Sequence, residues 1–430
     1  MTTEQRFELE LPDRLADLAM PVRPDYRDDI VRQTASMRQR PAWTLPERWI
    51  PMAVTTSRVA VPPRFPWRIL AVAALLVVIV AGALLFLVGS RPKLPAPFGP
   101  AANGLVAYSD KGDIYTVDPV TGRSTAIMPG ADTNRDPVFS RDGTHLVFYR
   151  LDPPLSPMSR LFVSASDGSA VTVITPDPLN HPGWYRFSPD GRQVAFVALV
   201  DGNQTLMVAN ADGSGVRTLP VGTAVSEPTW LPPNGTEILF ASISLGREPN
   251  GLYAVNVQTG KTRPILAPAY GAGADAAAAS PDGRRIAYSR SVSTLANQNT
   301  YQVHVIPSNG TGADVTLPMP RGAVFQDRPV WSNDGTRLAV IRGYGPHNED
   351  VRVAILPADG SGTGIESQHA ITGCCDNQME WAPDDSAILL MPEDRNGAAT
   401  ELNLVDASTG RATVASWGDT SLSSWQRRAP

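Results

Sequence analysis

The stretch Phe187-Ser-Pro-Asp-Gly191, followed at once by the apolar segment Gln193-Val-Ala-Phe196, decides the fold of this chain. Asp-Gly after a proline favours a tight turn, because the Asp side chain accepts bonds from nearby backbone and glycine adopts positive φ at no steric cost. An aromatic residue precedes the turn and a strand-like apolar run follows it. This cassette therefore predicts a β-hairpin.

The cassette recurs along the rest of the chain. Further copies begin at Phe139, Trp230, Ala279, Trp331 and Trp381, and a final, truncated copy is Ser424-Trp425-Gln426. Successive copies begin 43 to 52 residues apart, a period typical of four-stranded propeller blades. Two copies are irregular, since Ala279 replaces the aromatic residue and Asp385 replaces the glycine. A single four-stranded unit cannot bury both of its faces, so the units are expected to stack.

These cassettes resemble the repeats of TolB-type β-propellers, and they are similar to the propeller lids of dipeptidyl-peptidase and prolyl-oligopeptidase enzymes. The resemblance covers residues 104–428 and implies an all-β propeller of four-stranded antiparallel blades. TolB itself suggests six blades, but the copies here argue for seven. Strand-like segments at 105–127 match the second to fourth strands of a unit, and 422–425 matches a first strand. We predict that they form a composite seventh blade with Trp425 buried.

A membrane segment is predicted before the propeller. Ile69–Val88 is 20 residues long and holds no charged or polar side chain, enough for a helix to span the roughly 30 Å hydrocarbon core. Four arginines precede it within about 20 residues, against Arg91 and Lys93 after it. The positive-inside rule therefore predicts a single-pass protein of the cell membrane, with lipid around this helix, residues 1–68 cytoplasmic and the propeller extracytoplasmic. The Pro-rich segment 89–103 is predicted to be a semi-rigid stalk.

The head, residues 1–68, is predicted to bind a protein partner. Tyr26, Ile30, Thr34 and Met37 recur at helical spacing, and so short a segment buries too little apolar surface to be firmly stable alone. The layout resembles membrane-bound anti-sigma regulators, whose cytoplasmic head holds a transcription factor. The zinc-binding His and Cys pair of many such heads is missing here. Because the chain has a net charge of −5, nucleic acid is not an expected partner.

No catalytic motif emerges from the sequence. It has neither a Gly-x-Ser-x-Gly elbow nor a His-Glu-x-x-His helix, and its five histidines are scattered. We therefore expect a non-catalytic binding or sensing protein without cofactor or metal. The alternatives are an enzyme acting at the propeller channel, such as a polysaccharide lyase or a lactonase-like hydrolase, and a structural envelope protein.

The candidate binding residues lie where polar segments precede the predicted inner strands and would rim the channel. They are Asn134, Arg135, Asp136, His181, Glu227, Asp327, Arg328, Asn377 and Glu380. Converging polar groups at a channel mouth suit a small ligand or the chain end of a partner. Loops are also polar simply because water surrounds them, so this interpretation competes with a structural one.

The two cysteines, Cys374 and Cys375, are adjacent. In an oxidising compartment they would form a vicinal disulfide. The alternatives are two free thiols in a loop, or one thiol that pairs with another chain.

Overall fold

The chain divides into two compact units, Met1–Arg91 and Pro92–Pro430. The computed structural model describes residues 72, 74–77, 98–151, 158–175, 177–222, 225–242, 251–266, 273–291, 300–345, 350–370, 378–391, 402–415, 417 and 423–429. Residues 72 and 74–77 are helical. Within this described part of the chain, no helix has both the length and the apolar character needed to cross a bilayer. The head and the rest of the predicted span Ile69–Val88 lie outside the described residues.

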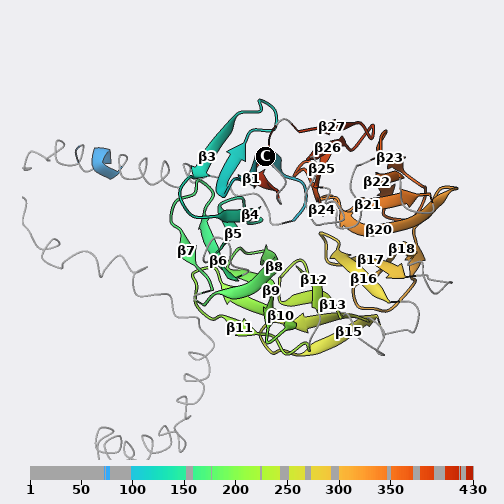
Figure 1. Cartoon of the computed structure of the whole chain (residues 1–430), viewed down its shortest axis with the longest axis horizontal. Coiled ribbons are helices and arrows are strands. Elements are labelled where there is room, and N and C mark those ends of the chain that lie inside the picture. The colour runs from blue at the N-terminus through green and yellow to red at the C-terminus, as the bar shows by residue number, and fades with distance from the viewer. Residues whose placement is uncertain are drawn as a thin grey trace, which may run out of the picture. The chain divides into compact units, whose positions relative to one another are not determined.

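The second unit is an all-β propeller whose blades follow one another around a ring in chain order (Figure 1). Blade 1 comprises β4 (Asn134–Phe139), β5 (His145–Leu151), β6 (Met158–Ala165) and β7 (Thr172–Val173). Blade 2 comprises β8 (Leu179–Phe187), β9 (Gln193–Val200), β10 (Asn203–Asn210) and β11 (Arg217–Thr218). Blade 3 comprises β12 (Val225–Trp230), β13 (Glu237–Ser242), β14 (Gly251–Asn256) and β15 (Thr262–Leu266).

The next three blades repeat the same antiparallel order. Blade 4 comprises β16 (Ala274–Ala279), β17 (Arg285–Ser291), β18 (Tyr301–Pro307) and β19 (Val315–Thr316). Blade 5 comprises β20 (Ala323–Trp331), β21 (Arg337–Tyr344), β22 (Asp350–Pro357) and β23 (Ile365–Glu366). Blade 6 comprises β24 (Gln378–Trp381), β25 (Ala387–Met391), β26 (Asn403–Asp406) and β27 (Ala412–Val414).

The seventh blade is built from both ends of the propeller. Its sheet order is β28 (Ser424–Arg428), β1 (Ala102–Asp110), β2 (Asp113–Val117) and β3 (Ser124–Met128). Trp425 pairs with Val106 and its side chain is 5% exposed. The predicted blade number, the composite closure and the burial of Trp425 are therefore all confirmed.

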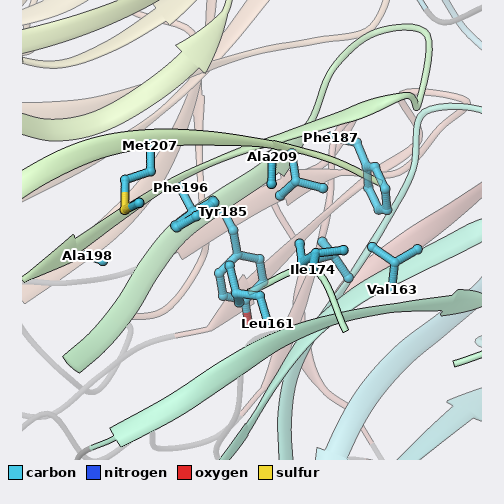
Figure 2. Close-up of a cluster of buried hydrophobic side chains, with 11 residues drawn as sticks. Leu161, Val163, Ile174, Tyr185, Phe187, Phe196, Ala198, Met207 and Ala209 are labelled. Carbon is cyan, nitrogen blue, oxygen red and sulfur yellow. The ribbon is translucent and has the colours of Figure 1, made fainter. Parts of the chain in front are cut away.

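Strand β9 shows why the blades must stack. Because successive side chains of a strand point to opposite faces, Val194, Phe196 and Ala198 pack toward blade 1, whereas Ala195 and Val197 pack toward blade 3. Figure 2 shows the first of these clusters, in which side chains of β8, β9 and β10 meet Leu161 and Val163 of β6. Strand β9 thus joins two interfaces, and each of the two buried clusters that it enters draws its described side chains from two blades.

The cassette turn is held by its own side chains, as predicted. In blade 2, Ser188 Oγ donates to Asp190 Oδ1 at 2.6 Å, and the same oxygen accepts the backbone N–H of Arg192 at 3.1 Å. The turn also contacts the preceding blade. A Cβ added to Gly283, whose φ is +69°, would lie 2.2 Å from the carbonyl oxygen of Pro232 in blade 3. Glycine is thus required there by both the backbone conformation and the close approach.

The aromatic position of the cassette links neighbouring blades. The indole N–H groups of Trp230, Trp331 and Trp381 donate to the carbonyl oxygens of Arg186, Ala278 and Val330 on the preceding inner strands, at 3.0 to 3.1 Å. Each acceptor residue immediately precedes the cassette aromatic position of its own blade. Tryptophan therefore recurs because its ring fills the interface while its polar edge is satisfied.

The cassettes of blades 5 and 6 each hold an irregular residue, and these two residues are hydrogen-bonded to each other. Asp385 replaces the turn glycine at a φ of 62°, and its carboxylate accepts the backbone N–H groups of Asn333 and Asp334, at 2.6 and 2.9 Å. Asn333 Nδ2 also donates to Asp385. Asn333 replaces the cassette proline, which would have no N–H to donate. The two irregular residues are partners across the blade interface.

Asp385→Gly is therefore expected to lower the free energy of unfolding by about 2 kcal/mol, although it restores the cassette glycine, because three donors lose a charged acceptor. Asn333→Pro removes two of those donors. The sum of the two single-variant costs should therefore exceed the cost of the double variant Asp385→Gly/Asn333→Pro by 1 kcal/mol or more. Denaturant unfolding of the four proteins measures this coupling, and strictly additive costs would contradict it.

Candidate functional site

The first strands of the seven blades surround a central cavity of about 370 Å³. In every blade the cavity is lined both by the cassette residue, which also packs between blades, and by the residue before it. The seven residues in the latter position form one layer. We call these seven residues the middle layer: Val138, Arg186, Thr229, Ala278, Val330, Glu380 and Ser424.

A second layer, the turn layer, is formed by the second residue after the aromatic position. Its members are Arg141, Pro189, Pro232, Pro281, Asn333, Pro383 and Arg427. Four prolines give this end of the cavity an apolar wall, and two arginines give it positive charge. On the other side of the middle layer, Trp184 and Arg328 line the cavity from bulges in β8 and β20, where both have left-handed φ angles.

The charge of the cavity is strongly unbalanced. Among the described residues that line it, four are arginines and one is acidic; they are Arg141, Arg186, Arg328, Arg427 and Glu380. Burial lowers the pKa of Arg427 to about 10, so this guanidinium still carries its charge at neutral pH. Burial likewise lowers the pKa of Arg141, a shift that Glu380 opposes and Arg186 reinforces. The charges of one cavity thus act on one another.

Glu380 is the single acid among these lining residues. Its Oε1 accepts the backbone N–H of Trp425 at 3.2 Å, which ties β24 to the closing strand β28. Burial raises the pKa of the Glu380 carboxyl to about 7, although this hydrogen bond, Arg186 and Arg141 each act to lower it. The Glu380 side chain is therefore partly protonated at neutral pH. In its protonated form it is neutral and offers no negative charge to the four arginines that line the cavity.

The raised pKa makes stability depend on pH. Between pH 4.5, the ordinary pKa of a Glu carboxyl, and about 7, the folded state holds a proton that the unfolded state has released, so stability falls as pH rises. Glu380→Gln keeps the oxygen that accepts the Trp425 N–H and removes the charge. At pH 8 we expect this variant to be more stable than wild type by about 3 kcal/mol, and the difference to vanish near pH 4.5. Melting curves across this range check it; a difference independent of pH would contradict it.

The sequence of the propeller matches one family model, that of the lipoprotein LpqB β-propeller domain. The match covers residues 186–424, more than half of the chain. The chain belongs to the LpqB β-propeller family. The matched region runs from the middle-layer residue Arg186 to the middle-layer residue Ser424. No curated protein matches the sequence significantly.

This chain is also similar to several solved structures. Oligogalacturonate lyase of Vibrio parahaemolyticus matches with a TM-score of 0.52 and 14% identity, covering 73% of this chain and 92% of the lyase. The periplasmic gluconolactonase of Pseudomonas aeruginosa matches with a TM-score of 0.51 and 15% identity, covering 75% and 99%. TolB of Acinetobacter baumannii matches with a TM-score of 0.47 and 16% identity, covering 76% and 81%. At such identities the likeness is one of fold alone.

The residues predicted from the sequence are not all brought together in this LpqB-family propeller. Arg328 and Glu380 line the cavity. Asn134 is buried and accepts a hydrogen bond from Arg150 Nε at 2.8 Å. Arg135 is exposed, and the carbonyl oxygen of Asp136 accepts the hydroxyl of Tyr185 at 2.5 Å.

The other predicted residues are either held locally or fall outside the described part. Asp327 accepts the backbone N–H of Arg328 at 2.7 Å, and burial raises the pKa of its carboxyl. The side chains of His181 and Glu227, and the whole of Asn377, Cys374 and Cys375, lie outside the described residues. Within the described part, no group of three or more His, Cys, Asp or Glu residues is placed to hold a metal ion.

Sequence reasoning missed Arg141, Arg186, Arg427 and Trp184. A signal for three of them was present. Arg141 occupies the proline position in the cassette that begins at Phe139, Arg427 occupies the same position after Trp425, and Arg186 directly precedes Phe187. Counting outward from the cassette aromatic would have placed all three in the channel. Trp184 depends on a strand bulge, for which the sequence gives no comparable signal.

Proposed function

We propose that this propeller is a non-catalytic binding and sensing module that takes a small anionic ligand, carrying a carboxylate or phosphate group, into its central cavity. The observation that carries the proposal is the set of four arginines against one acid in a cavity of about 370 Å³. Guanidinium groups form strong, charge-assisted bonds with carboxylate and phosphate oxygens. The volume lies at the small end of the range for ligand sites.

The side chains between the arginines suit a ligand with a flat or apolar body. Trp184 is 38% exposed and lines the cavity, so its ring offers a stacking face. The alanine and proline side chains of blades 3 and 4 offer apolar contact without competing hydrogen bonds. A ligand made of a ring with one acidic group could stack on Trp184 through its ring and bind the arginines through its acidic group.

Calorimetry on the full-length chain, purified in mild detergent, tests this proposal with galacturonate, inorganic phosphate and neutral galactose. Galacturonate differs from galactose by its carboxylate, so we expect the two anions to bind and galactose to bind at least tenfold more weakly. Arg186→Met should weaken anion binding about tenfold. Arg192→Met, in the exposed turn of the same blade, is the matched control. Equal binding of the sugars, or no binding of either anion, would refute the proposal.

A second candidate function is an enzyme that acts on such an anion in the same cavity. It is supported by the pKa of Glu380, which is raised to about 7, a value suited to a general acid or base. A polysaccharide lyase or a lactonase-like hydrolase would belong to this class. Glu380→Gln separates the two functions, because it would abolish turnover in an enzyme and leave anion binding intact in a sensor.

We further propose that the propeller is extracytoplasmic and anchored through Ile69–Val88, with residues 1–68 passing a signal to a cytoplasmic protein. The charge asymmetry around the apolar segment supports this topology, as does membership in a family described as a lipoprotein domain. Reporter fusions next to Ser90 and at the C-terminus test it. A C-terminal reporter that is active only in the cytoplasm would refute the topology.

A further inference from the structure

One end of the cavity is covered by the segment that leads into the first strand. We call this segment, residues 98–101, the strap. Phe98 lines the cavity, and the guanidinium of Arg141 lies over its ring at 5.2 Å. The carbonyl oxygen of Gly99 accepts Arg427 Nη2 at 2.5 Å, and the N–H of Ala101 donates to the carbonyl oxygen of Pro383 at 2.8 Å.

All three residues that hold the strap belong to the turn layer. Arg141, Pro383 and Arg427 come from blades 1, 6 and 7, which are neighbours around the ring. The strap therefore lies across the turn-layer end of the cavity, over the sector that carries both turn-layer arginines. A ligand reaches these arginines from the cavity side, while the strap holds them from the other.

The strap and an anion would use the same guanidinium groups. A cation–π contact contributes about 0.5–1 kcal/mol where water has access, and a bond from Arg to a neutral carbonyl is weaker than one to an anion. Because Arg427 also donates to Asn333 Oδ1 at 2.6 Å, its remaining donors are limited. An anion that draws Arg141 or Arg427 toward the cavity weakens the hold on Phe98 and Gly99.

We propose that anion binding in the cavity and closure of the strap are mutually exclusive, so that the ligand releases the strap from the turn layer. This inference rests on the proposed function, since it concerns the regulation of the same site. Coupling of this kind is reciprocal: whatever loosens the strap must raise the affinity for the anion by the same factor. Since the strap, residues 98–101, is part of the segment 89–103 predicted to be the stalk, its release is an output that the rest of the stalk can transmit.

The test combines calorimetry and hydrogen exchange on the full-length chain, with galacturonate and inorganic phosphate as probes. Phe98→Ala removes the ring that Arg141 contacts, and Pro100→Ala, at an exposed strap position, is the matched control. We expect Phe98→Ala to bind both anions about fivefold more tightly than wild type, and Pro100→Ala to bind them equally. In wild type, either anion should speed exchange of the Ala101 amide severalfold, because that N–H is held by Pro383 only when the strap is closed.

The outcomes separate this inference from the proposed function. Anion binding with unchanged affinity in Phe98→Ala and unchanged exchange at Ala101 would overturn the coupling and leave the cavity as an anion site. Weaker binding in Phe98→Ala would also overturn it, because Phe98 would then be part of the site. Failure of both anions to bind wild type and variant alike would refute the proposed function, and the coupling with it.

Discussion

Trp425→Ala is expected to lower the free energy of unfolding of the whole propeller by about 3–5 kcal/mol, although the residue lies five positions from the end of the sequence. Its ring is 5% exposed and packs in one cluster with Val106 of blade 7 and with Ala382 and Leu389 of blade 6. Its backbone N–H reaches Glu380 of β24. The loss therefore opens the interface that closes the ring.

Denaturant unfolding of the full-length chain measures this cost, and Trp184→Ala is the matched control. Trp184 is the same side chain at 38% exposure in the cavity, so its truncation should cost about 1 kcal/mol or less. Deletion of residues 423–430 removes β28 and should abolish the single cooperative transition, because the edge of β1 is then left unpaired. A truncated protein that melts like wild type would show that the ring does not depend on this closure.

The indole of Trp425 makes a finer distinction. Its Nε1 has no hydrogen-bond partner among the described residues, whereas Trp381 Nε1 donates to Val330 at 3.0 Å. Trp425→Phe should therefore cost less than Trp381→Phe, which leaves the Val330 carbonyl without its donor. Among the described residues, the side chain of the closing tryptophan therefore contributes through the packing of its ring.

The sequence predicted the propeller well because its repeat carries local physics. Each Asp-Gly turn specifies a hairpin, and the side chains of the strand after it alternate between two interfaces. The number of blades can therefore be predicted from the number of regularly spaced turns. Composite closure followed from unmatched strands at the two ends. These features depend on residues close together in the sequence, and the structure confirms them.

The cavity was harder to predict because its residues come together only in space. The rim prediction chose polar residues before each inner strand, and Asn134 is an example of one that is engaged with a neighbouring strand instead. Arg141, which occupies the proline position of its cassette, was not singled out from the sequence. Asp385 was recognised as an irregular cassette residue, but its partner Asn333 lies 52 residues away in the sequence and is bonded to it only in the folded chain. The predictions for Ile69–Val88, the head and the two cysteines fall outside the described residues and stay predictions.

Arg342→Met is expected to lower the free energy of unfolding by about 3–5 kcal/mol, the usual cost of removing one partner of a buried ion pair. Arg342, on β21, is fully buried. Its Nη1 pairs with Glu366 Oε1 on β23, and its Nη2 donates to Gln326 Oε1 on β20 at 2.6 Å. The guanidinium thus links the first, second and fourth strands of blade 5.

The loss of stability in Arg342→Met arises because Glu366 and Gln326 lose Arg342 as a hydrogen-bond donor. Glu366 loses Arg342 and retains only the hydroxyl of Tyr344, at 2.6 Å, among the donors described around Oε1. Gln326 Oε1, inside a fully buried side chain, loses both of the guanidinium bonds that it accepts. Met has a similar length, so the packing volume is largely kept and the electrostatic loss is isolated.

Arg352→Met, on the neighbouring strand β22, is the matched control. Arg352 pairs with Asp350 at 2.7 Å, but both side chains are about one-third exposed, so water screens the pair and its loss should cost about 1 kcal/mol or less. Denaturant unfolding of both variants gives the comparison. The double variant Arg342→Met/Glu366→Gln should recover part of the loss, because it removes the charge that Arg342→Met leaves unpaired. Equal costs for the two arginines, or no recovery in the double variant, would show that the buried pair is not what holds blade 5 together.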